Sequence, residues 1–185
     1  MQGAWLLLIS LGVFFIACII LYAVYVALRL KNDHGVIEPF SLNRWFILTT
    51  VILIGVSTLM NLAVSAVKRE ARVDLLRYLV LAFILSLVFF GIQSLCMADL
   101  VDKFTGDSSV GRTLHGLTFV LAFLHALHVF GGLIASGLVL VGAWKGKYDH
   151  ESYFPIRFSA LYWHFLDVVW VLMIIAFSMA ARLSK

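Results

Sequence analysis

Residues 5–28 read WLLLISLGVFFIACIILYAVYVAL, an apolar run without a single charged side chain. A helix of about 20 mostly apolar residues crosses the roughly 30 Å of hydrocarbon in a bilayer. Four further stretches have the same character, and we expect a membrane-spanning helix in each of them. The five predicted spans are residues 5–28, 45–67, 78–97, 114–143 and 156–181.

The composition agrees with a protein that has the bilayer as its main solvent. Of the 185 residues, 63% are hydrophobic and 13% are charged, whereas soluble domains have about 45–50% and about 25%. The charged residues lie between the predicted spans, in connections too short to hold a soluble catalytic domain. We therefore predict an all-α integral membrane protein, in which residues 1–185 form a single transmembrane domain, a bundle of five helices.

The formal net charge is +4, but the basic side chains are scattered over the ends of the predicted spans. This distribution is typical of membrane flanks and not of a nucleic-acid-binding surface. The 14 Lys and Arg residues divide equally between the two sides of the membrane, so their number does not define the orientation. The densest group, at residues 68–77, favours a cytoplasmic location for the second connection.

Several polar side chains fall at membrane depth, where each costs several kcal/mol unless it is paired or hydrogen-bonded. They are His115, His125 and His128 in the fourth span, His164 and Asp167 in the fifth, and Gln93 and Ser94 in the third. Residues three apart share a face of a helix. We therefore expect the His125/His128 and His164/Asp167 pairs to hold their helices to neighbouring helices by hydrogen bonds.

Haem ligation is the competing interpretation of these histidines, because membrane cytochromes use histidine pairs on facing helices. His125 and His128 lie too close together on one helix to straddle a macrocycle. A small haem-binding cytochrome b therefore remains as an alternative function, and half of a transporter or channel is a weaker one. The aromatic block of Tyr162, Trp163 and Trp170 is compatible with an interfacial belt or with a packing surface.

Two stretches carry a resemblance to a known family. FLHALHVFGG at residues 123–132 and YWHFLDVVW at residues 162–170 resemble the two signature stretches of subunit III of haem–copper oxidases, which read approximately GFHGLHV and YWHFVDVVW. Weaker likeness surrounds Gln93 and residues 10–15. The chain resembles the five-helix form of the family, which lacks the first two of seven helices.

Some family residues are present here and others are absent. The family residues that carry over intact are His125, His128, Tyr162, Trp163, His164, Asp167 and Trp170, together with Gln93. Three positions where the family has an acidic residue are occupied by Leu11, by a residue near Cys96 and by Arg157. Roles that depend on those carboxylates are therefore not expected in this chain.

The resemblance implies an accessory, non-catalytic subunit of a proton-pumping terminal oxidase that reduces dioxygen. Such a subunit has no haem or copper of its own, since these lie in subunit I and, for copper, also in subunit II. It packs against subunit I, holds phospholipid and supports proton uptake. The sequence does not distinguish cytochrome c from quinol as electron donor, and it leaves supercomplex membership open. The equivalent subunit of a quinol oxidase or one associated with nitric oxide reductases is the alternative.

The family topology implies a bacterial inner membrane protein with a cytoplasmic N-terminus and an external C-terminus, so that residues 68–77 and 145–157 face the cytoplasm. There, Arg69, Arg72 and Arg77 are candidates for binding lipid headgroups. Asp149, His150 and Glu151 form a candidate surface antenna for protons. A simple solvated loop is the favoured interpretation of those three residues.

Overall fold

The computed structural model describes residues 2–32, 45–106, 109–149 and 152–183. These residues form five α-helices and, within the described ranges, no strand. All five helices are long and apolar enough to cross a membrane, which confirms the predicted all-α membrane fold. The helices are α1 Gln2–Asn32, α2 Trp45–Lys68, α3 Arg72–Gly106, α4 Ser109–Trp144 and α5 Phe154–Leu183.

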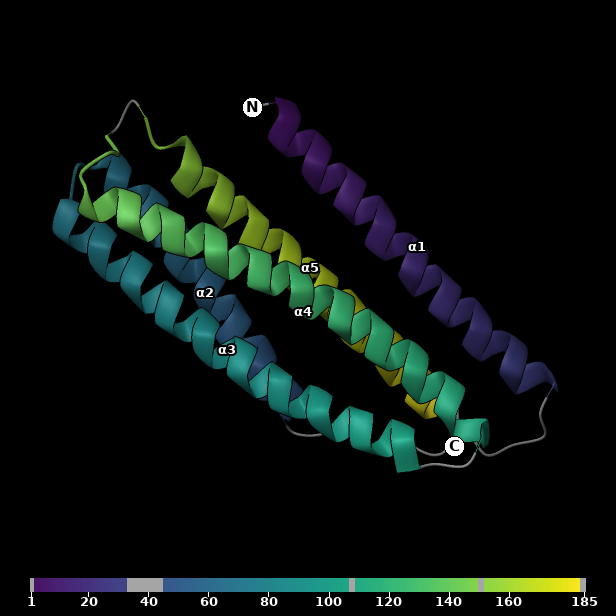
Figure 1. The fold of residues 1–185 in the computed structure, drawn as a ribbon. Coiled ribbons are helices and arrows are strands. Elements are labelled where there is room, and N and C mark those ends of the chain that lie inside the picture. Colours follow the sequence, from purple (N-terminus) through teal and green to yellow (C-terminus); the bar gives the residue numbers. More distant parts are fainter. Residues whose placement is uncertain (1, 33–44, 107–108, 150–151, 184–185) are drawn as a thin grey trace.

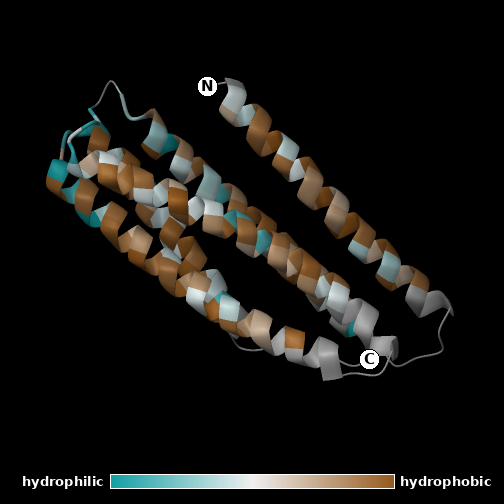
Figure 2. Ribbon diagram, viewed as in Figure 1, coloured by the Kyte–Doolittle hydropathy of each residue, from teal (hydrophilic) through white to brown (hydrophobic). Residues whose placement is uncertain are grey.

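Helix α5 contacts α1, α2 and α4, and helix α4 contacts α1, α3 and α5. Helix α3 packs against α2 and α4, and the described part of α1 contacts only α4 and α5. Figure 1 accordingly shows α1 along one edge of the molecule, away from α2 and α3. Apolar residues dominate the length of all five helices in Figure 2, as expected for helices that span a membrane.

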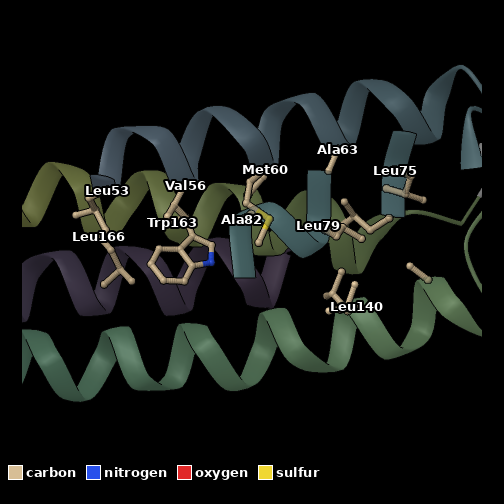
Figure 3. Close-up of a cluster of buried hydrophobic side chains, with 14 of the residues drawn as sticks. Leu53, Val56, Met60, Ala63, Leu75, Leu79, Ala82, Leu140, Trp163 and Leu166 are labelled. Carbon is tan, nitrogen blue, oxygen red and sulfur yellow. The ribbon is translucent and has the colours of Figure 1, made fainter. Parts of the chain in front are cut away.

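Two clusters of buried side chains hold the helices together. The larger joins α2, α3, α4 and α5, and Figure 3 shows Trp163 within it beside Val56 and Leu166. The smaller joins α1 to α4 and α5 around Phe15 and Phe177. Helix α1 is therefore attached by a cluster of its own.

Helices α2 and α4 end in the same way. At each end, crossed backbone hydrogen bonds close a Schellman motif: Ala71 N–H donates to Ala66 O (3.1 Å), and Lys147 N–H donates to Gly142 O (3.1 Å). The residues in the left-handed conformation are Glu70, with φ of 57°, and Gly146, with φ of 66°. A side chain at Gly146 would collide with the guanidinium of Arg72, and this guanidinium donates to Trp144 O (3.3 Å). The α2–α3 and α4–α5 connections therefore pack together at one end of the bundle.

Helix α3 extends beyond the predicted span at both ends, since residues 78–97 were expected and the helix covers Arg72–Gly106. Charged residues ended the hydropathy signal, but they do not end a helix. Asp74 lies in the first turn of α3, where a carboxylate interacts favourably with the helix dipole.

Gly132 lets α4 and α5 approach closely, and a larger residue there is expected to destabilise the bundle. A Cβ atom at Gly132 would lie 3.1 Å from Tyr162 Cε1 and 3.4 Å from Trp163 Cζ2. We expect Gly132→Leu to lower the free energy of unfolding by about 1–3 kcal/mol through overpacking, measured by denaturation of the detergent-purified full chain. Gly91→Leu is the matched control, because a Cβ there has nothing within 4 Å. Equal stability of the two variants would contradict this packing.

Candidate functional site

The two signature stretches face each other across the α4–α5 interface. The hydroxyl of Tyr162 on α5 donates to the backbone carbonyl of His128 on α4, at 2.9 Å. One turn further along α4, Gly132 leaves the space that the rings of Tyr162 and Trp163 occupy. The aromatic residues of one stretch therefore pack directly on the histidine- and glycine-containing face of the other.

The two tryptophans of the second stretch are buried and hydrogen-bonded. The indole N–H of Trp163 donates to Ser136 Oγ on α4 at 2.8 Å, and the indole N–H of Trp170 donates to Thr50 Oγ1 on α2 at 3.2 Å. Both tryptophans are 0% exposed. They are therefore packing anchors within the chain and not members of an interfacial belt.

The two histidines of α4 share a face but have different surroundings. The ring of His125 stacks on Trp170 with centroids 5.3 Å apart, and neither of its nitrogens has a hydrogen-bond partner among the described residues. His128 Nδ1 lies 2.6 Å from Leu124 O in its own helix, and its ring meets Phe15 of α1 edge-on at 5.0 Å. In the described part of the chain, these rings join helices by aromatic packing, and the expected interhelical hydrogen bonds from their nitrogens are not formed.

These surroundings do not fit a haem. A ligating histidine must direct a ring nitrogen into a space that holds the macrocycle, but both nitrogens of His125 are enclosed by protein. Its ring is packed between Trp170 and Phe15. Among the described residues, no three His, Cys, Asp or Glu side chains gather closely enough to hold a metal ion.

His164 and Asp167 lie on one face of α5, as their spacing predicts, with His164 Nδ1 3.9 Å from Asp167 Oδ2. Two residues of α2 complete this group. Asn61 Nδ2 lies 2.7 Å from His164 Nε2, and the buried Ser57 hydroxyl lies beside the Asp167 carboxyl. Because the Asn61 amide donates to Nε2, the proton of a neutral His164 is on Nδ1, which faces Asp167.

Sequence reasoning missed Ser57 and Asn61, although a signal for them existed. Both are polar residues inside the second predicted span, residues 45–67. Because polar groups are costly in hydrocarbon, they indicate a functional or packing role as much as the histidines do.

Gln93, one of the predicted packing residues, is 3% exposed on α3. Its Oε1 atom has no partner among the described residues. The neighbouring Ser94 bonds to Phe90 O in its own helix.

Of the three basic candidates, Arg72 lines a cavity at the end where α2 and α4 finish. This cavity has a volume of about 590 Å³ and is lined by residues that include Arg72, Tyr148 and Asp149. Partial burial raises the pKa of the Tyr148 phenol above its ordinary value, so its hydroxyl is a hydrogen-bond donor at neutral pH.

The other basic candidates lie on the surface: Arg77 is 3.6 Å from Asp74 in an exposed pair, and Arg69 is exposed. Of the antenna candidates, Asp149 is exposed, whereas His150 and Glu151 lie outside the described residues.

Comparison with known proteins shows the family of this chain. Residues 2–181 match the family described as cytochrome c oxidase subunit III. The chain belongs to this family. The match includes nearly all of the chain, so family membership extends over all five helices.

Three relatives illustrate the range of the cytochrome c oxidase subunit III family. The probable cytochrome c oxidase subunit 3 of Mycobacterium bovis is 30% identical over 154 residues, which are 82% of this chain and 74% of the relative. The cytochrome bo(3) ubiquinol oxidase subunit 3 of Pseudomonas aeruginosa is 26% identical, with 91% of this chain and 79% of the relative covered. The cytochrome c oxidase subunit 3 of Spodoptera frugiperda is 26% identical, with 76% and 92% covered.

Removal of the Asp167 carboxylate is expected to destabilise the chain. It would leave the Nδ1–H of His164 and the buried Ser57 hydroxyl without the acceptor beside them. We expect Asp167→Ala to lower the free energy of unfolding by about 1–3 kcal/mol, measured by denaturant titration of the full chain in detergent. The matched control is Val168→Ala, because Val168 is 60% exposed on the adjoining face. If both variants unfold at the wild-type denaturant concentration, the carboxylate has no structural role.

Proposed function

We propose that this chain is the accessory subunit III of a proton-pumping respiratory terminal oxidase in a bacterial inner membrane. The observation that carries the proposal is the family match over residues 2–181. Both signature stretches are also accounted for as packing surfaces within the bundle. In this proposal catalysis, haem and copper belong to partner subunits I and II. This chain stabilises subunit I, holds lipid and supports proton uptake.

A second candidate is the equivalent subunit of a quinol oxidase. It is favoured by the relative from Pseudomonas aeruginosa, which is named for a ubiquinol oxidase and matches 91% of this chain. Both candidates give the chain the same part in its complex and differ only in the electron donor of the whole enzyme.

The proposed orientation has the N-terminus in the cytoplasm and the C-terminus outside. The start of α1 lies at the same end of the bundle as the α2–α3 and α4–α5 connections (Figure 1). The two ends have equal numbers of Lys and Arg residues, but the densest basic group, at residues 68–77, lies at this end. Dense basic flanks are retained on the cytoplasmic side, which supports this orientation.

Purification of the tagged chain from its own membranes tests the function. We expect it to bring down haem-containing subunits, with a Soret band in the purified complex. The chain expressed without partners is expected to have no such band, because His125 is enclosed by protein. A stoichiometric Soret band in the isolated chain that His125→Leu or His128→Leu abolishes would instead establish a small cytochrome b.

Lipid binding at the cytoplasmic end is the second prediction of this proposal. The candidates Arg69, Arg72 and Arg77 lie at the end that holds the cavity, and Arg72 is one of its lining residues. Each cation near an anionic surface contributes about 1 kcal/mol. We therefore expect the triple change to Gln to reduce phospholipid retention in native mass spectrometry and each single change to have little effect. Lys145→Gln with Lys147→Gln is the control at the same end, and equal lipid loss in both variants would count against the arginine site.

A further inference from the structure

One face of the bundle carries exposed polar side chains inside the predicted spans, from the middle of α2 and α5 toward one end of α2. Thr58, Asn61 and Ser65 follow one another on α2 and are exposed, and the side chain of His164 beside them on α5 is 41% exposed. We call these four residues the α2–α5 polar face. Thr58 lies ten residues before Lys68, and His164 lies ten residues after Phe154. Both are therefore about 15 Å from that end of the bundle, half the thickness of the hydrocarbon.

The outward faces of the other helices differ from this one. On α4, the exposed side chains from Val120 to Val141 are large and apolar. The same holds on α3 from Leu81 to Leu95, apart from Ser94. These faces suit contact with lipid tails. Among the described residues, and away from the ends of the bundle, only the α2–α5 polar face brings polar side chains of two helices together at the surface.

Two of the four residues already donate a hydrogen bond within their own helix. The hydroxyl of Thr58 donates to Ile54 O at 2.8 Å, and that of Ser65 donates to Asn61 O at 3.1 Å. Asn61 differs from them, because its single hydrogen bond within the described residues joins Nδ2 to His164. Its amide oxygen is therefore an exposed acceptor without a donor among those residues.

Ser57 and Asp167 behind this face are adjacent to each other and enclosed, so the accessible acceptor left unmet among the described residues is the amide oxygen of Asn61. Hydrocarbon tails supply no hydrogen bonds, and each unsatisfied polar group in that medium costs several kcal/mol. Lipid headgroups lie about 15 Å away along the helices. The face therefore requires a polar group that reaches it within the membrane.

We propose that the α2–α5 polar face is where a transmembrane helix of another oxidase subunit docks, with a hydrogen-bond donor placed opposite Asn61. Small and polar residues are the usual contacts between membrane helices, because they permit close approach and hydrogen bonding. Thr58 and Ser65 supply the close approach, and Asn61 supplies the acceptor. This inference rests on the proposed function, which provides a membrane-embedded partner.

The first test compares a bulky substitution on this face with one on a lipid-facing face. Thr58→Trp and Leu127→Trp both place an indole at an exposed position in the middle of a span. We expect about tenfold less haem-containing partner to co-purify with Thr58→Trp and an unchanged amount with Leu127→Trp, at equal thermal stability of the two chains. Asn61→Leu, which removes only the hydrogen-bonding groups, is expected to reduce recovery about threefold or more.

The second test identifies what covers the face. A photoreactive benzoylphenylalanine replaces Thr58 or Leu127 in the assembled complex. Cross-links from position 58 to another oxidase subunit, with only lipid adducts from position 127, would support the proposal. Lipid adducts alone at position 58, or cross-links to a second copy of this chain, would overturn it. If even the wild-type chain recovers no haem-containing partner, the proposed function itself fails. If Thr58→Trp and Asn61→Leu both recover as much haem-containing partner as the wild-type chain, the docking proposal is wrong and the proposed function stands.

Discussion

Water is absent from the hydrocarbon core, so a polar side chain there must find its hydrogen bonds in protein. In this bundle, several polar side chains of α5 form their hydrogen bonds with neighbouring helices. The indole of Trp163 and the hydroxyl of Tyr162 donate to α4, whereas the indole of Trp170 donates to α2. These directional bonds fix the rotation of α5 about its axis. Because α5 contacts three of the other four helices, its rotation determines where their side chains pack.

Helix α1 is held mainly by aromatic contacts, together with one buried hydrogen bond from Thr118 Oγ1 on α4 to the Tyr22 hydroxyl at 3.4 Å. Phe15 packs edge-on to both His125 and His128, and Leu11 packs at the margin of the same cluster. The resemblance to the oxidase family places a glutamate at Leu11, so the polar contact that such a residue would make is absent here. Asp167 instead has its polar neighbours on its own helix and on α2. The carboxyl group of α5 is therefore oriented toward α2 and away from α1.

The sequence alone predicted the helices more completely than the contacts between them. Length and hydropathy sufficed for five spans, because the cost of exposing backbone to lipid leaves a helix as the only structure for such runs. The spacing of His164 and Asp167 sufficed to predict that they lie together, since residues three apart share a face in any helix. Thr50, Ser57, Asn61 and Ser136 were not predicted as partners. Their polarity was visible in the sequence, but their partners depend on the register between helices, which hydropathy does not give.

The two ends of the bundle and its middle use polar groups for different purposes. At the end with the α2–α3 and α4–α5 connections, Schellman motifs and the bond from Arg72 to Trp144 O satisfy backbone carbonyls that water could also reach. Those bonds shape the connections and contribute little net stability, because water competes for them. In the middle, no solvent competes, and a polar group without a partner is a continuing cost. The outward position of Asn61 and His164 on α2 and α5 therefore contradicts a chain surrounded on all sides by lipid, and agrees with one whose bundle is completed by other protein.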